Sequence, residues 1–193
     1  MAERSRWSPA ALLEWGLVVC LARTFAWLPE SAAYALGEAA GRLAYRIDGR
    51  HRAITLENLT RAFPGTYSPP EVEALARAVF ENLGRTAVDV ARSDRLLRGS
   101  SPEAVRIDGL TRLQEARRRG KGVLMIGAHF GPWELLPLIA AICYEPVHVV
   151  ARPLDNPRLD DMLTALRERG GNRVILKRDA ILAILQALRR GET

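Results

Sequence analysis

A histidine and a glutamate lie five positions apart in a segment that could carry proton-transfer chemistry. His129 and Glu134 belong to Gly-Ala-His-Phe-Gly-Pro-Trp-Glu, residues 127–134. The two glycines allow a sharp turn, and Pro132 suits the first position of a helix, which places Glu134 near the positive helix end. A carboxylate there stays ionised and can hold one imidazole nitrogen, while the other removes a proton from a hydroxyl. The spacing therefore predicts a general base oriented by an acid.

Other chemistries have less support in this sequence. A plainer interpretation of the pair is a half-buried histidine satisfied by backbone, followed by a helix-start carboxylate. The chain has no Gly-x-Ser-x-Gly nucleophile, Walker loop or His-Glu-x-x-His motif. We expect His51 to lie at the surface of an arginine-rich helix and His148 to be structural. Cys20 and Cys143 are far apart and form no Cys-x-x-Cys pattern, so neither a disulfide nor a metal site is predicted.

After residue 100, short apolar runs alternate with amphipathic segments. This rhythm is typical of strands and helices joined by right-handed crossovers, and hence of a mostly parallel sheet with flanking helices. We predict strands at 104–107, 122–126, 146–150 and 173–176, and helices at 110–118, 132–143, 156–169 and 180–189.

Cations follow two of the predicted strands, as His129 follows a third. Arg152 comes after the strand at 146–150, and Lys177 and Arg178 come after the strand at 173–176. Ligands of open parallel sheets bind at the carboxyl ends of the strands. If the strands are neighbours, a base and several cations gather beside an anionic substrate. Taken singly, Lys177 and Arg178 are better explained as solvated residues at the end of a strand than as functional ones.

The N-terminal segment 8–28 is mostly apolar, although Glu14 and Arg23 interrupt it. Trp7 and Trp27 would lie roughly 30 Å apart on a helix, close to the hydrocarbon thickness of a bilayer, and resemble interfacial anchors. We predict a membrane anchor that spans the bilayer or lies in its interface; the alternative is a buried core helix.

The region that follows, residues 31–100, is expected to be helical. Its first two predicted helices cover residues 31–47 and 50–63. The first of them contains a Gly-x-x-x-Gly pattern, which is a weak signal for close helix packing. Ser68 and Glu71 fit a capping box that opens a third helix, running to about residue 97. The predicted fold class is therefore α/β, with an anchor at 1–30, a helical region at 31–100 and an α/β domain at 101–193.

The charge balance favours an acidic partner. The formal net charge is +6, and all but two of the 28 basic residues are arginine, the exceptions being Lys121 and Lys177. Arginine binds phosphate and carboxylate in bidentate fashion, although a GC-rich genome would also favour this residue. The arginines are scattered and match no nucleic-acid reading motif, so a nucleic-acid partner is not expected.

Three ordered motifs resemble one known family. Residues 58–64 read Asn-Leu-Thr-Arg-Ala-Phe-Pro, residues 127–134 carry His-x4-Glu, and residues 152–157 read Arg-Pro-Leu-Asp-Asn-Pro. His-x4-Asp/Glu resembles the motif of glycerolipid acyltransferases. The surrounding residues resemble the late acyltransferases of lipid A biosynthesis, the lauroyl and myristoyl transferases.

The resemblance implies an O-acyltransferase on the cytoplasmic face of a bacterial inner membrane. Such an enzyme moves a fatty acyl chain from acyl carrier protein, or from coenzyme A in some relatives, onto a hydroxyl of an anionic glycolipid such as a lipid A precursor. His129 would deprotonate that hydroxyl and Glu134 would orient His129. Arg152 would bind an anionic head group, with Asn156 shaping the same pocket. No metal, cofactor or covalent intermediate is implied.

Members of that family are longer than this chain, which ends in or just after a predicted helix. The resemblance therefore implies an α/β domain that is incomplete at its C-terminal end. Two alternatives remain open at this point. One is a related enzyme with another acceptor, such as a phosphoinositol mannoside or an ornithine lipid. The other is an inactive half-domain that sits on membranes or joins a second chain.

Overall fold

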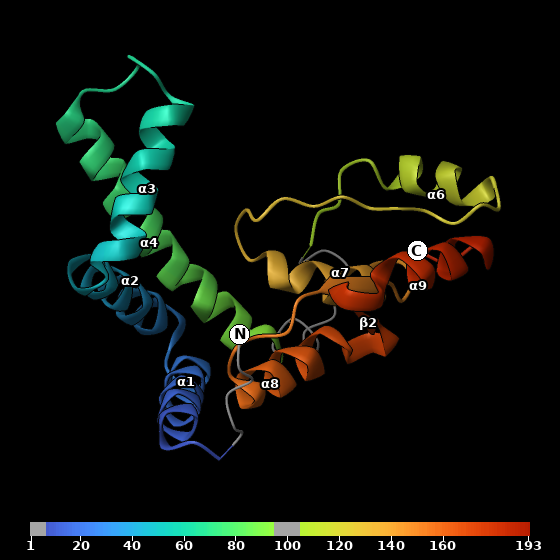
Figure 1. Ribbon diagram of the computed structural model, residues 1–193, viewed down its shortest axis with the longest axis horizontal. Coiled ribbons are helices and arrows are strands. Elements are labelled where there is room, and N and C mark those ends of the chain that lie inside the picture. The colour runs from blue at the N-terminus through green and yellow to red at the C-terminus, as the bar shows by residue number, and fades with distance from the viewer. Residues whose placement is uncertain (1–6, 95–104) are drawn as a thin grey trace. The chain divides into compact units, whose positions relative to one another are not determined.

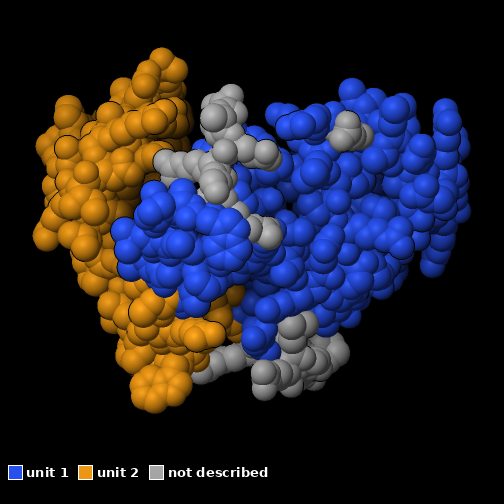
Figure 2. Space-filling view, turned by 60° about the horizontal axis from the view of Figure 1, so that its bottom comes forward, with its two compact units in different colours: residues 1–19, 93–193 blue, residues 20–92 orange. Residues whose placement is uncertain are grey.

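The computed structural model describes residues 7–94 and 105–193. The chain divides into two compact units, which Figure 2 colours separately. Unit 1 comprises Met1–Val19 and Ser93–Thr193, and unit 2 comprises Cys20–Arg92. The first helix, α1 (Pro9–Trp27), begins in unit 1 and ends in unit 2. The domain limits drawn from the sequence, at residues 30 and 100, stay predictions.

Besides the end of α1, unit 2 contains three helices that the sequence predicted, α2 (Glu30–Ile47), α3 (Gly49–Ala62) and α4 (Pro69–Ala91). The expected capping box opens α4, because the Ser68 backbone N–H donates to Glu71 Oε2 at 2.7 Å and the Ser68 hydroxyl contacts the same oxygen at 2.6 Å. The helix ends earlier than expected, at Ala91, and residues 95–97 of the prediction lie outside the described residues.

Three glycines let α2 and α4 pack with their backbones in contact (Figure 1). A Cβ atom at Gly41 would collide with the Phe80 carbonyl, and one at Gly84 would collide with the Gly37 carbonyl. The Gly-x-x-x-Gly pattern at residues 37 and 41 was a weak signal of close helix packing, and the structure confirms it. The edge-to-face pair of Tyr45 and Phe80, with ring centroids 5.4 Å apart, extends the same contact.

Gly84→Ala is expected to lower the free energy of unfolding by about 3 kcal/mol, because the added methyl meets rigid backbone that cannot move aside. Gly49→Ala is the matched control, since a Cβ there would meet only the end of the flexible Arg52 side chain, 4.0 Å away. Chemical denaturation in detergent measures both variants. Equal stabilities for the two variants would show that the α2–α4 contact is not tight.

Tyr34 of α2 and Asp89 of α4 form a short hydrogen bond, in which the phenol donates to Asp89 Oδ1 at 2.5 Å. This bond, with burial as a second cause, raises the pKa of Tyr34 to about 12. Because the folded-state pKa lies above the ordinary value, the bond stabilises the fold fully below pH 10. The stabilisation is lost as the pH rises from there through 12.

Spectrophotometric titration of the four tyrosines should therefore contain one late step near pH 12. Tyr34→Phe is expected to remove this step, whereas Tyr67→Phe should leave it in place. A titration curve whose late step survives Tyr34→Phe would contradict the assignment.

Unit 1 combines helices with a two-stranded parallel sheet, which confirms the predicted α/β class. Strand β1 (His148–Ala151) pairs with β2 (Arg173–Leu176), with Ala151 opposite Leu176. The crossover between them is α8 (Pro157–Arg167), followed by the 3-10 turn η3 (Arg169–Gly171). The other elements are α6 (Leu110–Arg118), η2 (Trp133–Leu135), α7 (Leu136–Cys143), η4 (Lys177–Asp179) and α9 (Ala180–Arg189).

The prediction of a buried strand at 122–126 is wrong. These residues adopt no strand, and Leu124 and Ile126 are 63% and 92% exposed. A strand requires a ladder of hydrogen bonds to a neighbouring backbone. Val123 N–H donates to the Glu192 carbonyl at 3.2 Å, and this single bond does not form a ladder. The predicted strand at 104–107 is wrong for residues 105–107, which form no strand, while residue 104 lies outside the described residues.

Helix α1 is long and apolar enough to cross a membrane, and most of its surface is exposed. Its C-terminal end is fixed within unit 2 by Arg92, whose Nη1 donates to the Phe25 and Leu28 carbonyls at 2.8 Å. A cation at these carbonyls satisfies the acceptors that a helix leaves free at its end. Arg92 therefore anchors the end of α1 onto the end of α4.

Candidate active site

His129 lies on an exposed turn that leads from residue 122 to η2. Gly131 has a φ of +56°, a conformation that favours glycine, so the sequence correctly marked this position as a sharp turn. The turn is closed by two backbone bonds of 2.9 Å, from Phe130 N–H to the Ala128 carbonyl and from Trp133 N–H to the Gly131 carbonyl. The imidazole lies against the Trp133 ring, with centroids 5.2 Å apart. His129 is thus an exposed residue with one face of its ring against Trp133.

Glu134 stands in the first turn of the helical segment, as the spacing predicted, but its carboxylate binds an arginine. Arg167 Nε donates to Glu134 Oε2 at 2.8 Å, and Arg167 Nη2 donates to Oε1 at 2.7 Å. The side chains are only 12% and 20% exposed, so the pair is well shielded from water. A bidentate pair fixes both the charge and the plane of the carboxylate. The structure does not bring Glu134 and His129 into hydrogen-bond contact, and their catalytic pairing stays a prediction.

Asn172 holds the elements around this ion pair. It is 4% exposed, and its amide nitrogen donates to the carbonyls of Pro137 and Arg167, both at 2.9 Å, and of Arg169 at 3.1 Å. Its side-chain oxygen accepts from Val147 N–H at 2.8 Å. One buried amide thus ties the start of α7, the end of α8 and the entry to β1 together, which positions Arg167 opposite Glu134.

The cations predicted at the sheet edge do lie on neighbouring strands. Because β1 and β2 are parallel and Ala151 pairs with Leu176, Arg152 and Lys177 leave the sheet side by side, with Arg178 next to them. All three are exposed. Arg152 is 3.7 Å from Asp155 Oδ1, and its side chain is 70% exposed, so a surface ion pair of this kind holds it only weakly. The edge therefore carries exposed positive charge.

Asn156, predicted to shape a substrate pocket, is a buried capping residue. It is 4% exposed, and its side-chain oxygen accepts from Arg158 N–H at 3.1 Å at the start of α8. Its amide nitrogen donates to the Ala11 carbonyl and to Glu14 Oε2, both at 3.0 Å. Asn156 thereby fixes the loop that carries Arg152, and any effect on a substrate would pass through that loop.

Sequence reasoning missed Arg167 and Asn172. Arg167 is an ordinary cation in the last turn of a helix, and nothing in its neighbours indicates a carboxylate partner 33 positions earlier. Asn172 follows two glycines, a pattern that indicates only a turn. The two remaining histidines were interpreted correctly: His51 is exposed and bonds Asp48, and His148 is half-buried, with Nε2 at 3.0 Å from Glu192.

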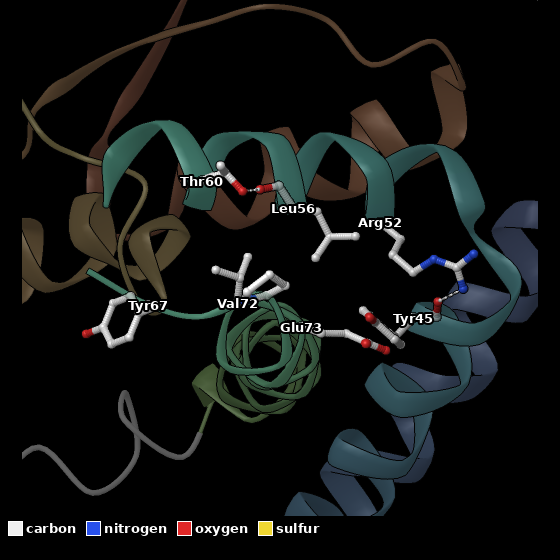
Figure 3. Close-up of a pocket in the computed structure, with 8 residues that line it drawn as sticks. Tyr45, Arg52, Leu56, Thr60, Tyr67, Val72 and Glu73 are labelled. Atoms are coloured by element: carbon white, nitrogen blue, oxygen red, sulfur yellow. Dashed lines mark hydrogen bonds between the residues drawn. The ribbon is translucent and has the colours of Figure 1, made fainter. Parts of the chain in front are cut away.

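Unit 2 has a separate pocket of about 670 Å³ (Figure 3). Two of its polar side chains are turned to backbone carbonyls: Thr60 donates to Leu56 at 2.9 Å and Arg52 to Tyr45 at 3.3 Å. The pocket shares no residue with the turn that carries His129. Its lining residues are Tyr45, Arg52, Leu56, Thr60, Tyr67, Pro69, Val72 and Glu73.

A metal ion would need a group of His, Cys, Asp or Glu side chains to bind it. Within residues 7–94 and 105–193, no three His, Cys, Asp or Glu side chains are grouped so that they could hold a metal ion.

Comparison with known proteins identifies the family to which this chain belongs. The chain matches the family of bacterial lipid A biosynthesis acyltransferases over residues 3–193, and it belongs to that family. It is 27% identical over 165 residues to the lipid A biosynthesis palmitoleoyltransferase of Escherichia coli K12, and 29% identical over 169 residues to the lauroyltransferase of the same organism. Each alignment covers 86% of this chain and 53% of the relative.

A third relative extends the match along almost the whole chain. The lipid A biosynthesis acyltransferase of Haemophilus influenzae is 29% identical over 192 residues, which cover 96% of this chain and 58% of the relative. The chain thus spans about half the length of the curated relatives it matches. No solved structure matches it significantly.

Proposed function

We propose that this protein takes part in O-acyl transfer from an acyl thioester to a hydroxyl of a lipid A-type glycolipid. The observation that carries the proposal is the His-x4-Glu segment of a lipid A acyltransferase family member, with an accessible His129 and a Glu134 carboxylate held rigidly by Arg167. The donor is a thioester of acyl carrier protein or of coenzyme A.

His129 acts as the general base of the reaction. It accepts the proton of the acceptor hydroxyl as the hydroxyl oxygen attacks the thioester carbonyl carbon. The carbon–sulfur bond then breaks, and the imidazolium returns the proton to the departing sulfur, which leaves as a thiol. The step consumes one hydroxyl and one thioester and yields one ester and one thiol.

Glu134 supports this step from the first turn of the helical segment. Arg167 fixes its carboxylate, and the exposed turn with Gly131 allows His129 to approach it when substrate is bound. Hydrogen bonds between catalytic groups are often absent before substrate arrives and form in the complex. The carboxylate would then orient the imidazole and stabilise its positive charge.

The substrate is held by the positive edge of the sheet. Arg152, Lys177 and Arg178 offer charge-assisted hydrogen bonds to the phosphate groups of a lipid A-type head group. Helix α1 brings this edge to a membrane, and we place the enzyme on the cytoplasmic face of the inner membrane, because both donors are soluble cytoplasmic thioesters. Arg152→Ala is expected to raise KM for the acceptor about tenfold with little change in kcat, as measured by initial rates.

The proposal is tested with the purified chain in detergent. Acyl-acyl carrier protein and acyl-coenzyme A are supplied in turn, each with a lipid A precursor, and release of free thiol is followed. Thiol release that requires the acceptor supports acyl transfer. Release at the same rate without acceptor would indicate thioester hydrolysis and reject the proposal. An ornithine lipid and a phosphoinositol mannoside, supplied as alternative acceptors, test the choice of substrate.

A second candidate function is that of a membrane-bound half-domain that does not catalyse acyl transfer. It is favoured by the exposure of Ile126 and Phe130, at 92% and 88%, in the same segment as His129. Apolar side chains in this position suit a surface that another polypeptide covers. This candidate predicts membrane binding without acceptor-dependent thiol release, which the same assay separates from the first.

A further inference from the structure

The N-terminal half of α1 is docked on unit 1 by polar contacts. Asn156 donates from its buried amide to the Ala11 carbonyl and to Glu14 Oε2, both at 3.0 Å. The Arg158 guanidinium lies 4.6 Å from the centroid of the Trp7 ring and 5.1 Å from that of the Trp15 ring, within the range of cation–π attraction. Ala11 is fully buried at this contact. The charge of Glu14, which interrupts the apolar segment, is thus accounted for by a partner in unit 1.

These contacts limit how α1 can meet a membrane. Asn156 and Arg158, which bind the first half of the helix, adjoin the charged loop at 152–155. Placing this loop in the hydrocarbon interior of a bilayer would be strongly unfavourable. The remaining part of the helix, residues 16–27, covers only about 18 Å, whereas the hydrocarbon core of a bilayer is about 30 Å thick. The helix therefore cannot cross the bilayer while the contacts with Asn156 are kept.

The opposite side of α1 carries a row of exposed leucines. Leu13 and Leu17 are 76% and 61% exposed, and Leu21, four residues further, continues the row at 36%. Trp27 is 85% exposed at the end of the helix. Arg23 is exposed further round the helix, and its side chain is long enough to reach lipid phosphate. Such a face matches a helix that lies in the membrane interface.

We infer that α1 is a monotopic anchor, which lies in the interface of an anionic phospholipid bilayer on its Leu13–Leu17–Leu21 row and does not cross it. Unit 1 and both ends of α1 are then on the same side of the membrane. This inference goes beyond the proposed activity and does not depend on turnover.

The test determines from which side of the membrane each of two introduced thiols reacts. The background is the full chain with Cys20→Ala and Cys143→Ala, into which Ser8→Cys or Gln114→Cys is introduced. Gln114 is exposed on α6 and reports the side of unit 1. A membrane-impermeant maleimide is added to spheroplasts and, separately, to inverted inner-membrane vesicles. We expect both thiols to react in the same preparation and to similar extents.

Reaction of Ser8→Cys from the side opposite to Gln114→Cys would overturn the inference, because α1 would then span the membrane. Reaction of Ser8→Cys only after detergent is added would also overturn it, because the first turn of α1 would then lie within the hydrocarbon. Neither labelling result depends on catalytic activity. A failure of the monotopic topology can therefore be distinguished from a failure of the proposed function.

The lipid-facing side is tested with vesicles of phosphatidylcholine and phosphatidylglycerol. Replacing Leu13 and Leu17 together by glutamine is expected to lower vesicle binding by about a hundredfold, since each buried leucine contributes roughly a factor of ten or more. Leu43→Gln on α2, where the leucine is 55% exposed, is the control and should bind as the unchanged chain does. Unchanged binding of the double variant, or an equal loss with Leu43→Gln, would reject this face as the contact.

Discussion

Replacing His129 by alanine is expected to lower kcat/KM for acyl transfer by about 10²- to 10⁴-fold, the usual contribution of a positioned general base. The physical reason is that an acceptor hydroxyl attacks a thioester slowly unless its proton is removed during attack. The imidazole is exposed and lies on a glycine turn, so its loss disturbs little packing. The measurement is the initial rate of acceptor-dependent thiol release, together with circular dichroism to show that the fold is kept.

The matched control is His51→Ala, which removes another exposed histidine, one that bonds Asp48 at the start of α3. Its transfer rate should stay within about twofold of the unchanged chain, because surface substitutions away from special features have small effects. A His129→Ala variant as active as His51→Ala would show that the base lies elsewhere.

Arg167→Met is expected to have the second largest effect, with a fall in kcat/KM of about a hundredfold, because a small misplacement of a catalytic group costs about that much. Methionine keeps much of the volume of the stem but removes both hydrogen bonds to Glu134. The carboxylate is then left shielded and unpaired, which should also lower the free energy of unfolding by about 2 kcal/mol. Initial rates and chemical denaturation measure the two effects.

Two further variants separate a positioning role from general damage. Arg117→Met breaks another half-shielded pair, with Glu145, and should lose some stability without the same loss of rate. Glu134→Gln combined with Arg167→Met should lose little more activity than either change alone, because both act on one carboxylate. Fully additive losses in the double variant would show that the two residues act independently.

Local signals in the sequence were sufficient for most of the helices. The capping box of Ser68 and Glu71, the glycine at position 120 after α6 and the two glycines after α8 each act within a few residues of the chain. The Gly37–Gly41 pattern predicted close packing but did not reveal its partner, because the contact with Gly84 depends on tertiary structure. The parallel pair β1–β2 also followed from the strand–helix rhythm, since parallel neighbours in a sheet need a long crossover, which is usually a helix.

The prediction failed where it depended on a distant partner. The apolar run at 122–126 reads as a strand, yet strand structure needs a neighbouring backbone, and the described residues supply a single bond from Val123. Glu134 was correctly placed in a first turn, but its partner Arg167 lies on another helix, 33 positions away. Asn156 was expected to face a pocket, and its burial became evident only once α1 was placed against the start of α8.

Mass spectrometry of the acceptor tests most directly the proposal that His129 and Glu134 catalyse acyl transfer to a glycolipid. A lipid A precursor incubated with the chain and acyl-acyl carrier protein should gain the mass of one acyl chain, with one thiol released per ester formed. His129→Ala should abolish that product and His51→Ala should not. An acceptor that keeps its original mass while the thioester is consumed, or an acylated product formed equally well by His129→Ala, would contradict the account.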